Sequence, residues 1–277
     1  FGPGFSGGPL IDKNNKVIGI ASAEGHALNL ALPINEIKPF LGGKNAISIA
    51  DFLKRDKISP QSFYYRGNFA LYGKGEISQA VKFFNKTLVE LPDFIMARYD
   101  LAVAYRNQGS IDQAIFEYEK ALQINPNFPE ALSNLGGQYF RLGRINKAID
   151  TLKRAVKSFP NFIQANSNLG AVLNKNGKYA ESIPYLKKAL QLEPEFGMAH
   201  YNLGNAYFGV EEFKKAKASL EKASNLGIEF VSLHWKLYEI HKETGDFERA
   251  RRELEFILEI DPENEEVKQK LLQKKGK

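Results

Sequence analysis

Apolar residues follow two different patterns in this chain, and the change between them falls near residue 60. Before it, short apolar runs such as Val17–Ile20 and Leu28–Leu32 are separated by Gly, Asn and charged residues, which is typical of strands joined by turns. After it, apolar residues recur every three or four positions, as at Tyr99 and Ala102, and indicate amphipathic helices. We therefore expect a mainly α protein with a short β segment at its start.

The helical part repeats itself every 34 residues. A Gly in the middle of each unit predicts the end of one helix, because the residue after a helix commonly adopts a positive φ. A Pro at the end of each unit stops a second helix. Small residues such as Gly136, Gly170 and Gly204 would let the two helix axes approach closely. The aligned positions are Ala80, Ala114, Ala148, Ser182, Ala216 and Ala250; Gly75, Gly109, Gly143, Gly177 and Gly245, with Glu211 as the exception; and Pro92, Pro126, Pro160, Pro194 and Pro262, with Ile228 as the exception.

This spacing, together with the phrase Asn-Leu-Gly at residues 134–136, 168–170 and 202–204, resembles the tetratricopeptide (TPR) family. The resemblance implies an α-solenoid, a right-handed superhelix of helical hairpins. After the repeats, residues 265–277 predict a capping helix and basic tail, with Val267, Leu271 and Leu272 turned inward. The six predicted repeats are 61–94, 95–128, 129–162, 163–196, 197–230 and 231–264.

The start of the chain has a different character. The phrase GFSGGPL at residues 4–10, followed by the apolar runs named above and by Ala-Leu-Pro at 31–33, resembles the end of a trypsin-like serine protease domain of the HtrA-like branch. The resemblance implies that residues 1–41 are the C-terminal fragment of an incomplete trypsin-like β-barrel and that 42–60 are a linker with a short helix. A Gly-rich turn in an unrelated small β module is the alternative.

The protease resemblance assigns roles to a few residues. Ser6 would be the nucleophile, the backbone N–H groups of Gly4 and Ser6 would form the oxyanion hole, and Ser22-Ala23-Glu24 would border the substrate. In this fold the catalytic His and Asp precede the Ser, but no His precedes Ser6. The chain begins at Phe1 within a Gly-rich phrase, so we expect a fragment of a larger protein that is inactive by itself.

The predicted concave face of the solenoid carries a candidate binding site. Asn134, Asn168 and Asn202 form a ladder at one place of three successive repeats, and a side-chain amide both donates and accepts hydrogen bonds. Such a ladder is suited to the backbone of an extended peptide, with Tyr99, Tyr201 and Trp235 as aromatic anchors next to it. The alternative is that these Asn side chains bond only to neighbouring repeats. The ladder place as a whole carries Arg66, Asp100, Asn134, Asn168, Asn202 and Lys236.

Composition limits the classes of partner that the chain is expected to bind. The net charge is +6, but residues 1–60 hold +2 and 265–277 hold +3, so the repeats carry no basic stripe for nucleic acid. There are no Cys residues, which excludes a disulfide scaffold, a Cys-ligated metal site and a thiol nucleophile. No apolar run is long enough to span a bilayer. We expect a protein or peptide ligand, no nucleic acid, no membrane span, no metal and no cofactor.

Three functions fit these observations. The first is a multidomain trypsin-like serine endopeptidase whose TPR solenoid recruits proteins, which is compatible with an exported, periplasmic bacterial location for the parent. The second is a non-enzymatic TPR scaffold or adaptor. The third is the TPR arm of a glycosyltransferase, which would need a catalytic domain after the repeats. The substrate, the oligomeric state and the compartment stay open.

Overall fold

The computed structural model describes residues 9–11, 17–25, 28–33 and 59–273. The chain forms two compact units, Phe1–Pro126 and Asn127–Lys277, which we call unit 1 and unit 2 and describe one at a time. The division falls inside the predicted run of repeats, at the end of repeat 2. The predicted linker at 42–60 lies outside the described residues except for its last two positions.

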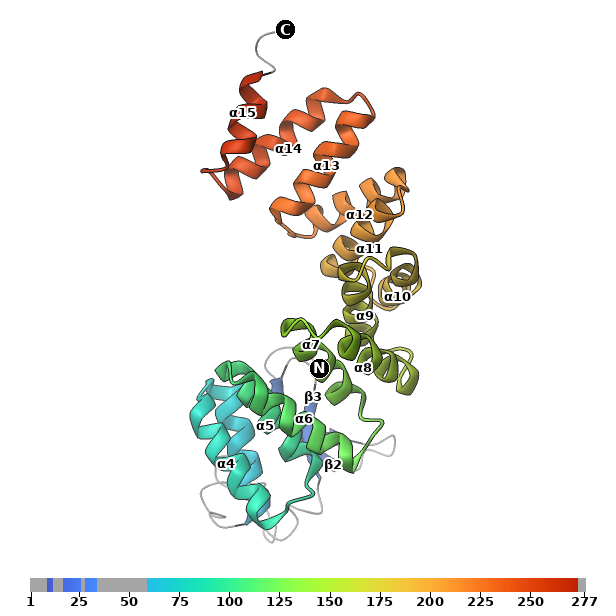
Figure 1. Ribbon diagram of the computed structural model, residues 1–277. Helices are drawn as coiled ribbons and strands as arrows, with labels where there is room; N and C mark the ends of the chain where they lie inside the picture. Colours follow the sequence, from blue (N-terminus) through green and yellow to red (C-terminus); the bar gives the residue numbers. More distant parts are fainter. Residues whose placement is uncertain (1–8, 12–16, 26–27, 34–58, 274–277) are drawn as a thin grey trace. The chain divides into compact units, whose positions relative to one another are not determined.

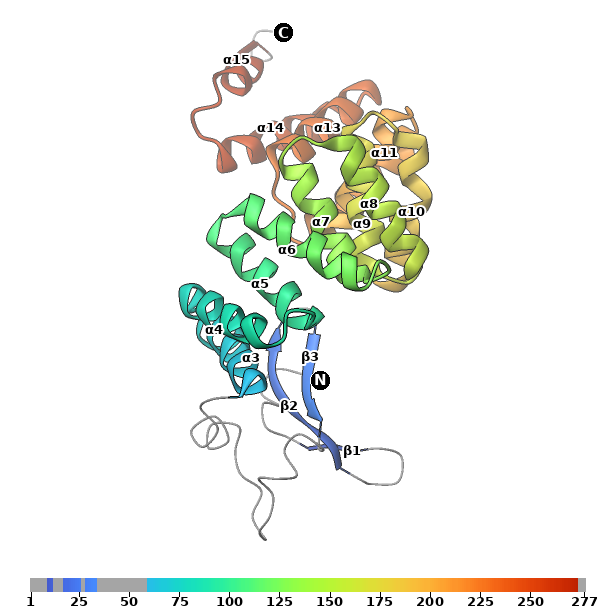
Figure 2. The same ribbon diagram turned by 60° about the horizontal axis from the view of Figure 1, so that its bottom comes forward.

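Three short strands lie at the start of unit 1. They are β1 (Pro9–Ile11), β2 (Val17–Gly25) and β3 (Leu28–Pro33). They form an antiparallel sheet in the order β1-β2-β3, in which Ile20 pairs with Pro9 on one side and with Leu32 on the other. Figure 2 shows β2 and β3 running side by side. A three-stranded meander of this size occurs in many folds, so its backbone does not identify a trypsin-like barrel.

The rest of the described chain is helical and consists of antiparallel hairpins (Figure 1). The first helix of each of repeats 2 to 6 begins at the residue where the 34-residue spacing places it, from Ile95 to Val231. Unit 1 contains α3 (Pro60–Asn68), η2 (Phe69–Lys74), α4 (Ile77–Glu90), α5 (Ile95–Gln108) and α6 (Ile111–Ile124). Unit 2 contains α7 (Pro129–Arg141), α8 (Ile145–Ser158), α9 (Ile163–Lys175), α10 (Tyr179–Leu192), α11 (Gly197–Gly209), α12 (Phe213–Asn225), α13 (Val231–Glu243), α14 (Phe247–Ile260) and α15 (Glu265–Gln273).

The turn between the two helices of a repeat requires a left-handed residue, as the sequence predicted. Gly143 and Gly177 have φ of 70° and 73°, where a side chain would be strained. Glu211, the exception in the Gly column, is forced into the same conformation with φ of 62°. The missing Pro at Ile228 is compensated by a different stop, because Gly227 ends α12 with φ of 82° and Ile228 N–H bonds to the carbonyl of Ala223.

Glycine also permits the close contact between the two helices of a repeat. A Cβ atom on Gly136 would lie 2.6 Å from Cγ of Leu152, and one on Gly204 would lie 2.6 Å from Cγ of Leu220. The predicted close approach is therefore confirmed. These contacts anchor a core of Leu and Ala side chains between the helices.

Repeat 1 departs from the common register by one residue. The glycine that faces its second helix is Gly67, which opposes Phe84, although the 34-residue spacing points to residue 68. The first helix therefore holds one extra residue, and the π-helical turn η2 absorbs it before Gly75 ends the helix with φ of 69°. Arg66 accordingly does not occupy the ladder place that the sequence assigned to it.

The helix α15 packs against the end of repeat 6. Val267 is fully buried, and Leu271 packs against the same cluster of residues from α13 and α14. Leu272 is 67% exposed, however, so its predicted inward orientation is wrong. In the repeat register Leu272 holds the place of Gly136 and Gly204, which faces a second helix, and within the described residues α15 has no such helix.

Candidate functional site

The candidate site is the side of unit 2 that carries Asn134, Asn168 and Asn202, which we call the ladder face. These residues come from α7, α9 and α11, and α9 packs directly against both of the other two helices. The three Asn residues therefore lie on neighbouring helices that are 34 residues apart in sequence. The stacking of the first helices places equivalent residues in a row, as expected of helical repeats.

The three ladder residues differ in their surroundings. Asn134 and Asn168 are half-buried, and Asn202 is 8% exposed. The amide of Asn168 donates a long hydrogen bond of 3.4 Å to the hydroxyl of Ser133 on the preceding repeat. Asn168 thus contributes a contact between repeats, and its amide oxygen is a further acceptor on the same side chain.

A second row of residues accompanies the ladder one turn further along each helix. Gly137, Ala171 and Asn205 each follow a ladder residue by three positions and so share its side of the helix. A Cβ atom on Gly137 would meet no other atom within 4 Å, which shows open space beside Asn134. The amide oxygen of Asn205 is buried and has no hydrogen-bond partner. The ladder face therefore combines amide groups with open space beside Asn134.

A buried polar network holds the helix that carries Asn202. The amide nitrogen of Asn174 donates to the carbonyl oxygen of Asn202 at 2.7 Å, and the Ser182 hydroxyl donates to the Asn174 amide oxygen at 2.5 Å. Ser182 is the residue that departs from the Ala column, and it is fully buried. Through Asn174, Ser182 therefore connects repeats 4 and 5 beneath the ladder. The sequence alone did not reveal this role.

The predicted aromatic anchors do not form one continuous row beside the ladder. Tyr201 is half-buried; its hydroxyl shares a hydrogen bond of 2.7 Å with Ser232, and its ring meets Phe230 edge-on with centroids 5.1 Å apart. Trp235 packs with Tyr238 against the residues covered by α15, and the ammonium of Lys270 lies 5.7 Å from its ring centroid. Tyr201 thus bridges repeats 5 and 6, whereas Trp235 belongs to the cap contact.

Tyr99 and Asp100 in unit 1 are core residues. Tyr99 is 4% exposed and packs against Tyr118, so its predicted role on an open face is wrong: the ring fills the space between α5 and α6. Asp100, at the ladder place of repeat 2, is 1% exposed and accepts hydrogen bonds from the hydroxyls of Tyr64 at 2.9 Å and Tyr72 at 2.7 Å. Burial raises the pKa of Asp100 to about 7, although both hydrogen bonds act to lower it.

The residues assigned by the protease resemblance stay untested. Gly4 and Ser6 lie outside the described residues. Ser22, Ala23 and Glu24 lie in β2, where Ser22 pairs with Leu30 of β3. Their roles at a substrate edge remain a prediction from the resemblance.

The histidines of the repeats take part in packing. His234 is 4% exposed and shares a hydrogen bond of 2.7 Å with Glu253, the same pair of places that Arg98 and Glu117 occupy in repeat 2. His200 contacts the carbonyl oxygen of Pro194 at 2.9 Å. In the described ranges no three His, Asp or Glu side chains gather as a metal site would require.

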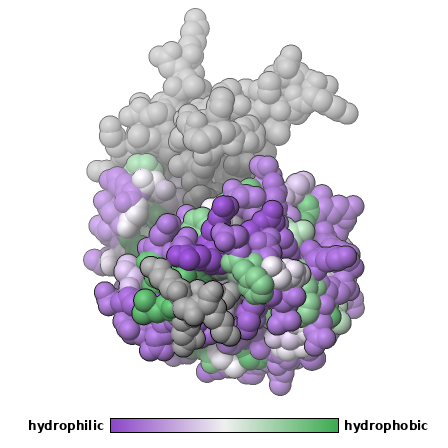
Figure 3. All heavy atoms as spheres, turned by 90° about the horizontal axis from the view of Figure 1, so that it is seen from above, coloured by the Kyte–Doolittle hydropathy of each residue, from purple (hydrophilic) through white to green (hydrophobic). Residues whose placement is uncertain are grey.

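The surface of unit 2 near α15 is mostly hydrophilic, and hydrophobic residues there form small separate patches (Figure 3). The exposed apolar side chains of the last two helices include Phe256 and Leu272. Among the helices that the structure describes, none has both the length and the apolar character that a bilayer crossing requires.

Comparison with known families gives a consistent result for the repeats. A model of the TPR repeat matches residues 103–143, 136–177 and 172–210, and a second model, of the tetratricopeptide repeat, matches 199–226. The matches run through both units and include all three ladder residues. No curated protein matches the sequence.

Several solved structures share the fold. PilF of Pseudomonas aeruginosa is 21% identical with a TM-score of 0.68, over 77% of this chain and 97% of PilF. MamA of Desulfovibrio magneticus RS-1 is 24% identical with a TM-score of 0.55, over 62% of this chain and 97% of MamA. YrrB, described as a TPR protein with an unusual peptide-binding site, is 19% identical with a TM-score of 0.58, over 69% of this chain and 97% of YrrB. The mainly α TPR solenoid is thereby shown, whereas nothing in these comparisons supports a trypsin-like segment.

Proposed function

We propose that this chain, which contains tetratricopeptide repeats, is a non-enzymatic scaffold that binds an extended segment of a partner protein on the ladder face of unit 2. The observation that carries the proposal is the row of three amide side chains on α7, α9 and α11, with open space beside it at Gly137. The peptide-binding site ascribed to YrrB, a protein of the same fold, is a further support.

The chemistry of the face favours backbone recognition. An extended peptide presents N–H and C=O groups in alternation, and an Asn side chain can satisfy one of each. The helices α7, α9 and α11 carry few charged side chains, since Glu130, Arg141 and Lys175 are the whole set. A ligand held in this way would be chosen by its extended backbone and by small or polar side chains more than by charge.

The serine endopeptidase reading receives no such support. None of the comparisons reported above supports a trypsin-like segment, and Gly4 and Ser6 lie outside the described residues. We therefore prefer the scaffold to a protease fragment, and the roles of Gly4, Ser6, Ser22, Ala23 and Glu24 play no part in the proposal.

A binding experiment tests this function. A library of random, unstructured peptides is selected on the full chain, and the affinity of a selected peptide is measured by fluorescence anisotropy at pH 7.5. Replacing Asn134, Asn168 and Asn202 together with Ala should weaken binding tenfold or more, because each lost hydrogen bond contributes on the order of 1 kcal/mol.

The control replaces amides on the second helices of the same repeats, Asn146, Gln191 and Asn225, all of which are exposed. This variant should bind like the wild type. If the ladder variant keeps both its affinity and its melting temperature, the peptide does not use the ladder and the proposal fails.

A further inference from the structure

The contact between repeats 5 and 6 contains two titratable residues at places that are otherwise uncharged. Lys217 on α12 stands where repeats 3 and 4 carry Ile149 and Ile183. His241 on α13 stands where repeats 3, 4 and 5 carry Tyr139, Leu173 and Tyr207. Both exceptions fall at one joint, because α12 packs against α13 there.

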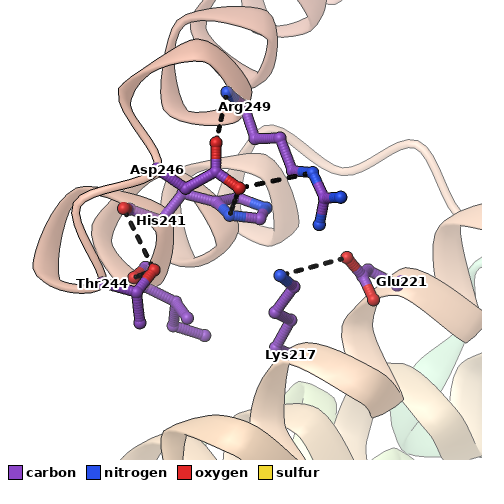
Figure 4. Close-up of polar contacts among 7 residues, drawn as sticks. Lys217, Glu221, His241, Thr244, Asp246 and Arg249 are labelled. Atoms are coloured by element: carbon purple, nitrogen blue, oxygen red, sulfur yellow. Dashed lines mark hydrogen bonds and ion pairs between the residues drawn. The ribbon is translucent and has the colours of Figure 1, made fainter.

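His241 is buried without a full set of hydrogen bonds. Its side chain is 1% exposed, and its ring nitrogen Nδ1 has no hydrogen-bond partner. The nearest acidic oxygen, Oδ2 of Asp246 in the following turn, is 3.9 Å away. Figure 4 shows His241 close to Asp246, with Lys217 on the neighbouring helix.

The charges that face His241 come from three elements and are largely paired with one another. On α12 they are Lys217 and Glu221, whose charged groups are 3.8 Å apart. In the turn, Asp246 accepts the backbone N–H of Arg249 at 3.2 Å and pairs with its guanidinium at 3.3 Å. Glu253 on α14 is the third, and it is engaged by His234. The acids near His241 therefore already have other partners.

The environment favours the neutral imidazole. Burial lowers the pKa of His241, and the Lys217 ammonium lowers it further, while Glu253, Asp246 and Glu221 act weakly in the opposite direction. A charged imidazolium at this place would be buried and would face another cation.

We propose that the contact between α12 and α13 is a proton-sensitive joint: it is closed while His241 is neutral and loosens when His241 gains a proton. This inference rests on the proposed function, because the Tyr201–Ser232 hydrogen bond beside the ladder joins the same two repeats. Acidification would thus alter the end of the ladder face nearest to α13 and weaken its hold on a bound peptide.

The direction of the effect follows from proton linkage. In the unfolded or opened segment, His241 has an ordinary pKa of about 6.5. The closed joint binds the proton less well than the open segment does. It is therefore fully stable above a pH of about 6.5 and loses stability as the pH falls below that value. For one proton the opening equilibrium changes by at most about tenfold per pH unit.

Hydrogen exchange of the full chain, expressed as protection factors, tests the joint. Between pH 7.5 and 5.5 the amides of α13 should lose protection at least threefold, while those of α9 change little. His241→Tyr, which installs the residue of repeats 3 and 5, should remove this response. His200→Asn is the matched control, because Asn166 makes the same bond to a proline carbonyl in repeat 4, and it should keep the response.

Three results would overturn the proposal: protection of α13 that is constant or rises on acidification, a response that survives His241→Tyr, or a response that His200→Asn abolishes. If His241→Tyr does not fold, Lys217→Ile serves in its place and should reduce the response. The ladder variant distinguishes the two proposals, since it should lose peptide binding at pH 7.5 and keep the pH response of α13.

Discussion

The same place in the repeat serves different purposes in the two units. In repeat 2 it carries Asp100, which is enclosed in the core of unit 1 and bonded by two tyrosine hydroxyls. In repeats 3 to 5 it carries Asn134, Asn168 and Asn202, on helices packed side by side, and the first two are half-buried. Within repeats 2 to 5, equal spacing along the chain therefore gives equivalent backbone positions but not equal access to a ligand.

The largest effect is expected from replacing Asp100 in the core of unit 1. Asp100→Ala would leave the hydroxyls of Tyr64 and Tyr72 buried without an acceptor, and should destabilise unit 1 by about 2–4 kcal/mol. Hydrogen exchange of α5 and α6 at pH 6 measures the loss. Tyr72→Phe removes one donor only and should cost about 1 kcal/mol. Equal losses in the two variants would show that the carboxylate does not hold both hydroxyls.

The next effect concerns helix packing. Gly170→Ala should destabilise unit 2 by about 1–3 kcal/mol, because the new methyl group would collide with Leu186 of the facing helix. Unit 1 already carries Ala102 at the same place, fully buried, so Ala102→Gly should bring no gain. Urea denaturation compares the two variants, with hydrogen exchange of α9 reporting on Gly170→Ala and that of α5 on Ala102→Gly. A stable Gly170→Ala variant would contradict the close packing.

Opposite pH dependences sharpen the comparison further. Since the pKa of Asp100 is raised from 3.8 to about 7, the folded unit 1 binds a proton that the unfolded chain releases. Its stability should therefore fall as the pH rises from 4 to 7, by at most about 1.4 kcal/mol per pH unit. The joint at His241 in unit 2 should weaken in the other direction. Exchange of α5 and α13 over this range measures both slopes, and Asp100→Asn should flatten only the first.

The smallest effect concerns one turn of unit 2. Glu211 is exposed and holds a left-handed φ of 62°, where the corresponding turns carry glycine. Glu211→Gly should stabilise unit 2 by up to about 1 kcal/mol, because it removes the steric penalty of a side chain in this conformation. A melting curve detects the gain, and Gly177→Ala should produce a loss of similar size. A lower melting temperature for Glu211→Gly would contradict the strain.

Sequence reasoning succeeded where one residue type has one physical reason. Gly143 and Gly177 mark left-handed turns, and Gly136 and Gly204 mark close helix contacts, so these features follow from the chain alone. It failed where the outcome depends on three-dimensional neighbours. The exposure of Tyr99 and Leu272 depends on what packs against each, and the register of repeat 1 depends on a π-helical turn that no spacing rule predicts.

The candidate site was predicted in part. The Asn ladder is visible as a column of identical residues, whereas the open space at Gly137 and the buried network of Asn174 and Ser182 depend on how neighbouring helices approach one another. Lys217 and His241 are also visible as exceptions in their columns. Only their packing at one joint connects them, which is why the sequence alone did not pair them.

The most direct test of the account is the map of hydrogen-exchange protection when a selected peptide binds the full chain. Peptide binding should add protection on α7, α9 and α11, the helices of the ladder face, with little change on α8, α10 and α12. Protection that appears on the second helices, or in unit 1 alone, would contradict the claim that Asn134, Asn168 and Asn202 hold the ligand.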